Sequence, residues 1–328
     1  MISATTLILA ALLDYLVGDP WGWLHPVQVM GWVIDLWSKL TWKYLSHPIA
    51  RKISGIGLFL VLVVGSGFGS WLFLHILRDI EPLVAQILEI ILLASCLAGR
   101  SLRRAAQDVL EPLTMGDIEE ARLRLKKYVG RDTDRLTTPE IYRAVLETVA
   151  ENATDGVTAP LFYALLGASL PAVGPVPLAL AYKAASTLDS MVGYRQEPYT
   201  DLGWCSAQIE DVLTWFPCRL TVLTLALLSG QPIAVLAICQ RDARQDPSPN
   251  SGWSECIYAA ILGVQLGGDN YYQGKLRSKP LLGDDTQIIG ADQIDRALHF
   301  TRQVFLLWLL LWLGGWVVSQ FLKLPPTH

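Results

Sequence analysis

The sequence predicts an all-α integral membrane protein, and three features support that prediction. Hydrophobic residues make up 52 % of the 328-residue chain and charged residues only 17 %, below the roughly 25 % of ordinary soluble domains. The mean hydropathy is +0.36. Several apolar runs approach or exceed the ~20 residues that a helix needs to cross a bilayer. No stretch alternates apolar and polar residues between turn signals, so we expect little sheet.

Four segments are predicted to span the membrane, within a single membrane domain covering residues 1–328. The spans lie near residues 2–18, 53–77, 83–99 and 303–322. The first is short and contains Asp14, which is costly inside a bilayer. Two further apolar runs, 157–182 and 219–240, are interrupted by Pro and Gly, a pattern typical of re-entrant or cavity-lining segments. If these runs also cross, the number of spans rises to six.

The distribution of basic residues predicts the orientation. Loop 100–156 carries ten Lys and Arg and loop 241–302 carries seven, whereas none precedes Lys39. Because basic loops stay on the cytoplasmic side, we expect a multi-pass protein of the inner (cytoplasmic) membrane with mainly cytoplasmic polar loops and outward-facing termini. The chain start lacks the basic region of a signal peptide, so 2–18 is expected to be a retained helix.

Charge and cysteine content exclude several classes. The net charge of −4 argues against a nucleic-acid partner. Five cysteines without a C-x-x-C spacing suggest free thiols in a reducing compartment. The run Gly268–Lys275 resembles a P-loop but has one residue too many between its glycines, and Leu276 replaces the required Ser or Thr. Gly65 and Gly69 have a spacing that allows close helix packing.

One predicted helix carries a row of carboxylates. It begins at Thr137 and Thr138, with Pro139 and Glu140 in its first turn, and Asp155-Gly156 is expected to end it. The further acids Glu147 and Glu151 recur with Asp155 at intervals of four, so all three share one face. Like charges at this spacing repel, and hard cations prefer oxygen ligands. A magnesium site and a solvated acidic face are both consistent with this pattern.

Further polar sets flank the apolar runs. Lys183, Ser186, Thr187 and Ser190 share a helix face with Asp189 at its edge, which suits either phosphate binding or helix packing. Carboxylates recur at Glu210 and Asp211. The turn 247–253 is expected to precede a helix capped by Ser251.

Four ordered runs resemble the CobD/CbiB family of cobalamin biosynthesis. The runs are Asp14 to Val27 with Gly18-Asp19-Pro20 and His25-Pro26; Glu147 to Tyr163 with Glu151-Asn152, Asp155-Gly156 and Ala159-Pro160; Tyr182 to Tyr194 with Lys183, Thr187-Leu188-Asp189-Ser190 and Gly193; and Ser248 to Gly268 with Pro249-Asn250 and Gly252-Trp253. The resemblance covers about residues 10–300. It departs from the family pattern at Ser186, Gln208, Glu210, Thr214 and Asp246, which weakens positions 208–214 and 246 as direct ligands.

The resemblance implies an acid–amine ligase, adenosylcobinamide-phosphate synthase. Such an enzyme joins adenosylcobyric acid to aminopropanol phosphate with ATP as co-substrate and Mg²⁺ as cofactor, using a cobalt-containing corrinoid. The lipid bilayer and other cobalamin-biosynthesis enzymes are the further partners expected. A corrinoid-binding transporter and a non-catalytic membrane regulator of the same fold remain alternatives. The amino alcohol preferred and the nature of the activated acid, acyl phosphate or acyl adenylate, stay open.

Site residues follow from the same resemblance. The residues expected to act on or orient the reactants are His25, Lys183, Asp189, Ser190 and Asn250. Those expected to bind substrate or phosphate are Asn152, Arg195, Arg219 and Arg241. Those expected to hold the metal are Glu151, Asp155, Glu210 and Asp211.

Overall fold

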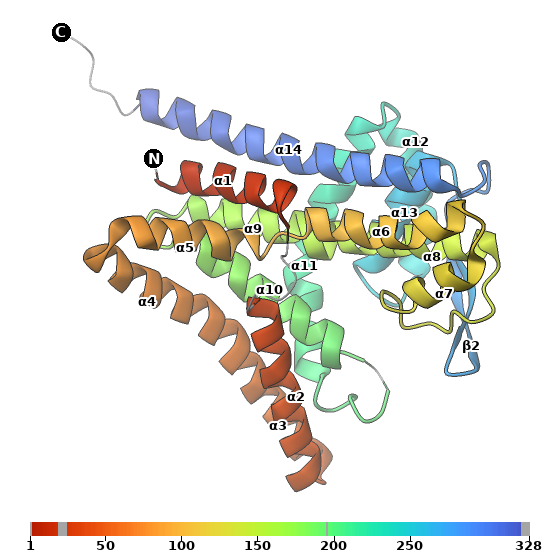
Figure 1. Ribbon diagram of the computed structural model, residues 1–328, viewed down its shortest axis with the longest axis horizontal. Helices are drawn as coiled ribbons and strands as arrows, with labels where there is room; N and C mark the ends of the chain where they lie inside the picture. The colour runs from red at the N-terminus through yellow and green to blue at the C-terminus, as the bar shows by residue number, and fades with distance from the viewer. Residues whose placement is uncertain (1, 19–24, 195, 323–328) are drawn as a thin grey trace. The chain divides into compact units, whose positions relative to one another are not determined.

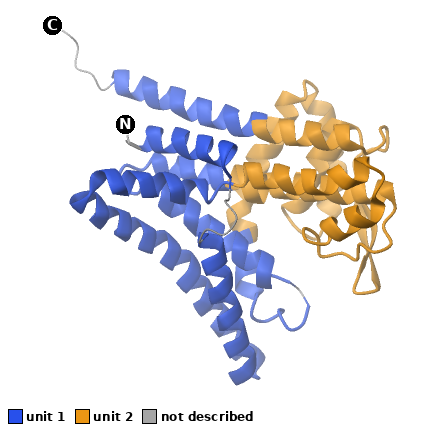
Figure 2. Cartoon of the chain, viewed as in Figure 1, with its two compact units in different colours: residues 1–97, 160–210, 303–328 blue, residues 98–159, 211–302 orange. Residues whose placement is uncertain are grey.

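The computed structural model describes residues 2–18, 25–194 and 196–322, and it is 75 % helical (Figure 1). One two-stranded hairpin makes up the sheet of the described chain. The predicted all-α membrane fold is therefore confirmed. The chain divides into two compact units, unit 1 with residues 1–97, 160–210 and 303–328, and unit 2 with residues 98–159 and 211–302 (Figure 2).

Unit 1 is made of long apolar helices. It contains α1 (Ile2–Leu16), α2 (Pro26–Tyr44), α3 (Pro48–Phe59), the π-helical segment η1 (Leu60–Val64), α4 (Gly65–Ile80), α5 (Pro82–Ala94), α10 (Pro175–Val192) and parts of α9 (Ala159–Ala168), α11 (Trp204–Leu228) and α14 (Ala291–Leu322). Proline begins α2, α3, α5 and α10, where its missing N–H costs no hydrogen bond. The close packing that we expected at Gly65 and Gly69 occurs instead at Gly67, where an added Cβ would lie 3.1 Å from that of Ala181 on α10.

Four stretches are long and apolar enough to cross a membrane. They are Pro48–Ile80, Pro82–Thr114, Trp204–Leu228 and Ala291–Leu322. The first, second and fourth contain the predicted spans 53–77, 83–99 and 303–322. The third overlaps the run 219–240, which is interrupted as predicted, with α11 ending at Leu228 and α12 beginning at Pro232. The predicted span 2–18 forms α1, a shorter apolar helix.

Unit 2 combines shorter helices with the hairpin. It contains α6 (Gly99–Thr114), α7 (Ile118–Leu125), α8 (Thr138–Asn152), the π-helical segment η2 (Ala153–Thr158), α12 (Pro232–Asp242), the 3₁₀ turn η3 (Ala243–Gln245), α13 (Ser251–Leu262), β1 (Leu266–Tyr272) and β2 (Lys275–Leu282), with the remainders of α11 and α14. Helix α8 contacts α6, α7, α13 and β1. It therefore forms the centre of the unit.

Helix α8 begins as predicted but does not end as predicted. The Thr137 N–H donates to Glu140 over 2.7 Å, within the expected capping box. The expected end at Asp155-Gly156 is wrong, because the helix continues through η2 into α9. Gly156 lacks the positive φ of a helix C-cap. Its small size instead lets Ala98 approach, and the Ala98 N–H donates to the Gly156 carbonyl over 3.0 Å.

The P-loop-like run proves to be a β-hairpin. Strands β1 and β2 pair antiparallel, with Tyr272 opposite Lys275. The two turn residues, Gln273 and Gly274, both have positive φ, as a tight hairpin turn requires. Gly267 lies at an irregularity near the base of the hairpin, with a φ of 85°. The residues between Gly268 and Gly274 thus belong to β1 and to the hairpin turn.

Candidate functional site

The carboxylate row, which begins on α8 and ends with Asp155 in η2, divides into one buried acid and two more exposed ones. Glu147 is 2 % exposed, and its two oxygens accept from Arg131 and, over 2.9 Å, from the Gly267 N–H. Glu151 is exposed and Asp155 is half-buried. Glu147 therefore holds the hairpin, whereas the Glu151 and Asp155 side chains are more accessible to solvent.

Two arginines complete the attachment of the hairpin to α8. Arg131, 8 % exposed, donates to the Asn270 side-chain oxygen over 2.7 Å. Arg143 donates to the carbonyls of Gly267 and Asp269 and to the same Asn270 oxygen. Burial disfavours the charge of Arg131, but Glu147 outweighs burial and raises the pKa of Arg131. Both arginines are thus largely occupied by protein partners.

A second buried ion pair lies beside this network, and sequence reasoning missed it. Lys279 on β2 lies 3.1 Å from one oxygen of Glu255 on α13, and Glu255 is fully buried. Burial raises the pKa of Glu255 above its ordinary value; Lys279 opposes that shift, while Glu151 and Glu147 add to it. The sequence offers little indication of this pair. Glu255 lies two residues after Trp253 of a recognised motif, and Lys279 lies in the hairpin whose sequence resembled a P-loop.

Asn250 occupies the N-cap position of α13, in place of the expected Ser251. Its side-chain nitrogen donates to the Asp211 carbonyl over 2.9 Å. Its side-chain oxygen is buried and accepts no hydrogen bond from the described residues. Ser248 holds the turn by accepting from the N–H groups of Asn250 and Ser251. The structure thus joins Asn250 to Asp211 and leaves one amide oxygen of Asn250 as a buried acceptor.

Arg219 and Arg241, both expected to bind phosphate, have protein partners in unit 2. The Arg219 guanidinium lies 4.5 Å from the ring centre of Trp253 and 5.4 Å from that of Trp215. It also donates to the Pro249 carbonyl over 2.8 Å. Such cation–π contacts hold a guanidinium in place without neutralising it. A phosphate bound at Arg219 would therefore meet a fixed positive charge.

Arg241 is paired with carboxylates. It donates to both oxygens of Asp242 and to Asp284, each over 2.7 Å. The hydrogen bond from Arg241 holds the pKa of Asp242 below its ordinary value, aided by the Gly283 N–H at 3.0 Å. Arg241 is thus part of an ion-pair cluster with the buried Asp242 and the half-buried Asp284.

The residues predicted on α10 lie in unit 1. Lys183 and Asp189 are half-buried and Ser190 is exposed, whereas Thr187, predicted on the same face, is buried. The Ser190 hydroxyl donates to the Thr187 carbonyl over 2.9 Å. The Ser190 carbonyl accepts from the Tyr194 hydroxyl over 2.8 Å. This face carries the cation and hydroxyl that the sequence pattern indicated.

The remaining predicted residues are spread over both units. In unit 1, His25 caps α2 by accepting from the Val27 N–H over 3.2 Å, and Glu210 is buried on α11. In unit 2, Asn152 is exposed at the end of α8 and donates to the Thr148 carbonyl over 2.9 Å. Arg195, Asp19 and Pro20 lie outside the described residues.

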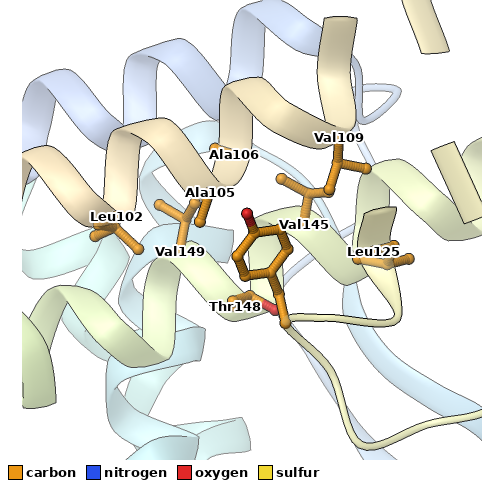
Figure 3. Close-up of a pocket in the computed structure, with 9 residues that line it drawn as sticks. Leu102, Ala105, Ala106, Val109, Leu125, Val145, Thr148 and Val149 are labelled. Atoms are coloured by element: carbon orange, nitrogen blue, oxygen red, sulfur yellow. The ribbon is translucent and has the colours of Figure 1, made fainter. Parts of the chain in front are cut away.

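One pocket of unit 2 is apolar. It is a small hollow between α6, α7 and α8, where Leu102, Val109, Leu125, Val145 and Val149 line it (Figure 3). The Tyr128 hydroxyl, from another lining residue, donates to Asp108 over 3.0 Å. No charged side chain lines the pocket. The polar chemistry of unit 2 therefore lies outside it.

The chain is similar to known proteins over nearly its whole length. The family model described as CobD/Cbib protein matches residues 7–301. The cobalamin biosynthesis protein CobD of a Synechocystis strain is 58 % identical over 92 % of this chain and 88 % of that protein. The cobalamin biosynthesis protein CbiB of Salmonella typhi is 42 % identical over 89 % of this chain and 90 % of that protein. No solved structure matches significantly.

Proposed function

Because the chain belongs to the CobD/CbiB family of cobalamin biosynthesis proteins, we propose that it is an adenosylcobinamide-phosphate synthase. The reaction joins the propionate carboxylate of adenosylcobyric acid to the amine of aminopropanol phosphate. The observation that supports this most strongly is the family match over residues 7–301, which includes the motifs around Glu151, Lys183 and Asn250. The protein is proposed to act at the inner membrane, with these motifs on the cytoplasmic side.

The chemistry explains why such an enzyme needs both carboxylates and cations. A carboxylate is a poor electrophile until one of its oxygens becomes part of a leaving group. ATP supplies that group as phosphate or AMP; the amine then attacks the acyl carbon, the leaving group departs with the oxygen, and the nitrogen loses a proton. Because several anionic reactants must lie close together, fixed positive charges and precise orientation lower the barrier.

The accessible acids of unit 2 fit a magnesium–phosphate ligand. Mg²⁺ is usually held by one or two carboxylates together with substrate phosphates. Glu151 and Asp155 supply such oxygens, and Asp211 in unit 2 and Glu210 in unit 1 are further candidates. No group of three or more His, Cys, Asp or Glu within the described ranges could hold an ion by itself. Bound Mg²⁺ would neutralise phosphate charge.

The other predicted residues are proposed to bind and orient the reactants. Lys183 and Ser190 on α10 would bind an anionic group through an ammonium and a hydroxyl. Asn250 would accept a substrate N–H through its buried side-chain oxygen. Arg219 would contribute its fixed charge. The motif residues Asp189, His25, Asn152, Arg195 and Arg241 remain candidates on the family resemblance.

Growth complementation tests this proposal. The gene is expressed in a bacterium that lacks its own family member and must make cobalamin from supplied cobyric acid. We expect the wild-type chain to restore growth and Asp155→Asn or Lys183→Ala to fail while still accumulating in the membrane. Supplied cobinamide should rescue every strain. Growth absent with cobyric acid but present with cobinamide for the wild-type chain would contradict the synthase. Corrinoid uptake into vesicles without covalent change would then favour transport.

A further inference from the structure

The pair formed by Lys279 and Glu255 in unit 2 has unused hydrogen-bonding capacity. One oxygen of Glu255 accepts from Lys279, while the other is buried and accepts no hydrogen bond from the described residues. Lys279 has three N–H donors, and its one hydrogen bond in the described chain is to Glu255. Its side chain is 33 % exposed. A ligand reaching this ammonium could therefore bind on its exposed side.

The neighbouring cations are used differently. Arg131 is buried and bound to Glu147 and Asn270, and Arg143 is bound to the hairpin backbone. Arg241 is bound to two aspartates. Lys279 differs from these three because it is fixed by a fully buried partner and still presents unsatisfied donors to solvent.

The carboxylates around Lys279 would also attract a positively charged group on a ligand. Arg131 neutralises Glu147, and Lys279 neutralises Glu255. Glu151 lies close enough to act electrostatically on both members of the second pair, and it adds an exposed negative charge. The unpartnered oxygen of Glu255 thus favours a ligand ammonium, while Lys279 favours a ligand anion. A zwitterionic ligand could contact Glu255 through its ammonium group and Lys279 through its anionic group.

We propose that Glu255 and Lys279 bind the aminoalkyl phosphate substrate, with Lys279 holding its phosphate and Glu255 holding its ammonium group. This inference rests on the proposed function, because the amine partner in that reaction carries both groups on a short chain. Binding requires the lysine side chain to move aside and expose Glu255, which is fully buried in the free protein. The acceptor that remains buried and unpartnered in the free protein then receives an N–H donor.

Calorimetric binding to the full-length protein in detergent tests the two contacts separately. The probes are 1-amino-2-propanol O-phosphate, isopropyl phosphate, which lacks the amine, and 1-amino-2-propanol, which lacks the phosphate. We expect the wild-type protein to bind the first probe at least about tenfold more tightly than either of the others, since a charge-assisted hydrogen bond contributes about that much.

Each substitution should remove one preference and leave the other. Lys279→Met should abolish the advantage of the phosphate group, so that the first probe and 1-amino-2-propanol bind alike; Lys279→Arg should restore it in part. Glu255→Gln should abolish the advantage of the amine. Lys275→Met, a loss of an exposed lysine on the same strand, should change neither. General damage to the fold would weaken all probes together and would not produce this pattern.

Two results would overturn the inference. One is unchanged probe preferences in both Lys279→Met and Glu255→Gln; the other is a wild-type protein that does not prefer the zwitterion. Growth complementation remains a separate readout. If the wild-type chain complements while the preferences are unchanged, this binding site is wrong and the synthase proposal stands. If the preferences change as expected but the chain does not complement, the synthase proposal fails while the binding site stands.

Discussion

Each of the buried acids Glu147 and Glu255 in unit 2 is paired with a basic side chain. Such pairing helps to distinguish acids that hold the fold together from acids that could bind a ligand. Glu147 shares a face with Glu151 and Asp155, but Arg131 and the hairpin backbone occupy it. Sequence spacing could show the shared face because helix periodicity determines it. It could not show which acid is neutralised, because Arg131 lies on the segment before α8 and Gly267 lies 120 residues further along the chain. Sequence spacing also could not pair Glu255 with Lys279, because Lys279 lies on strand β2 and Glu255 on helix α13.

Asp242→Asn should destabilise the protein at neutral pH but not at low pH. Arg241 and the Gly283 N–H hold the pKa of Asp242 below its ordinary value of 3.8. A lowered pKa stabilises the folded state above the unfolded-state pKa, and this contribution is lost as pH falls through the folded-state pKa. Thermal melting in detergent should therefore show a lower midpoint than wild type at pH 7 and a shrinking difference toward pH 3. A difference independent of pH would contradict this.

At the scale of elements, local signals predicted beginnings better than ends. The capping box at Thr137 and Glu140 is confirmed because it depends on four neighbouring residues. The stop expected at Gly156 is wrong because Gly156 serves a contact with Ala98, which lies on another segment. The hairpin was hidden because glycines that suit a phosphate-binding loop also suit a tight turn and a strand irregularity. The sequence thus predicts a helix or a turn correctly where neighbouring residues determine it, and less well where contacts with distant segments do.

Gly267→Ala should damage the hairpin more than Gly274→Ala. Both glycines have positive φ, at 85° and 75°, so both substitutions strain the backbone similarly. Only at Gly267 would the added Cβ collide with the Pro280 carbonyl of the facing strand; at Gly274 it would meet open space. We expect a clearly lower melting midpoint for Gly267→Ala and easier proteolysis of the hairpin. Equal effects would show that steric contact with β2 does not govern this position.

At the scale of the whole molecule, hydropathy identified the membrane character and three of the four long apolar stretches. The stretch Trp204–Leu228 was harder to recognise because its first half carries Glu210 and Asp211 before the apolar half begins. The division into two compact units was not predicted, because the segments of each unit alternate along the chain. The motifs fall in both units, with Lys183 in unit 1 and Glu151 in unit 2.

Cysteine labelling tests the predicted orientation. The five native cysteines are buried, so introduced ones should dominate the signal. Met115→Cys lies in the basic loop 100–156 and Glu81→Cys in the short turn between α4 and α5, and both positions are exposed. A membrane-impermeant maleimide should label Glu81→Cys in intact cells and Met115→Cys only after permeabilisation. The reverse pattern would place the polar loops outside.

Product formation by the purified protein tests the proposed synthase activity directly. The detergent-purified chain is incubated with adenosylcobyric acid, aminopropanol phosphate, ATP and Mg²⁺, and the corrinoid mass is followed. We expect a new species at the mass of the amide, dependent on ATP, with release of ADP or AMP that identifies the activated acid. Bound corrinoid without any amide, under every nucleotide and metal tried, would contradict the synthase.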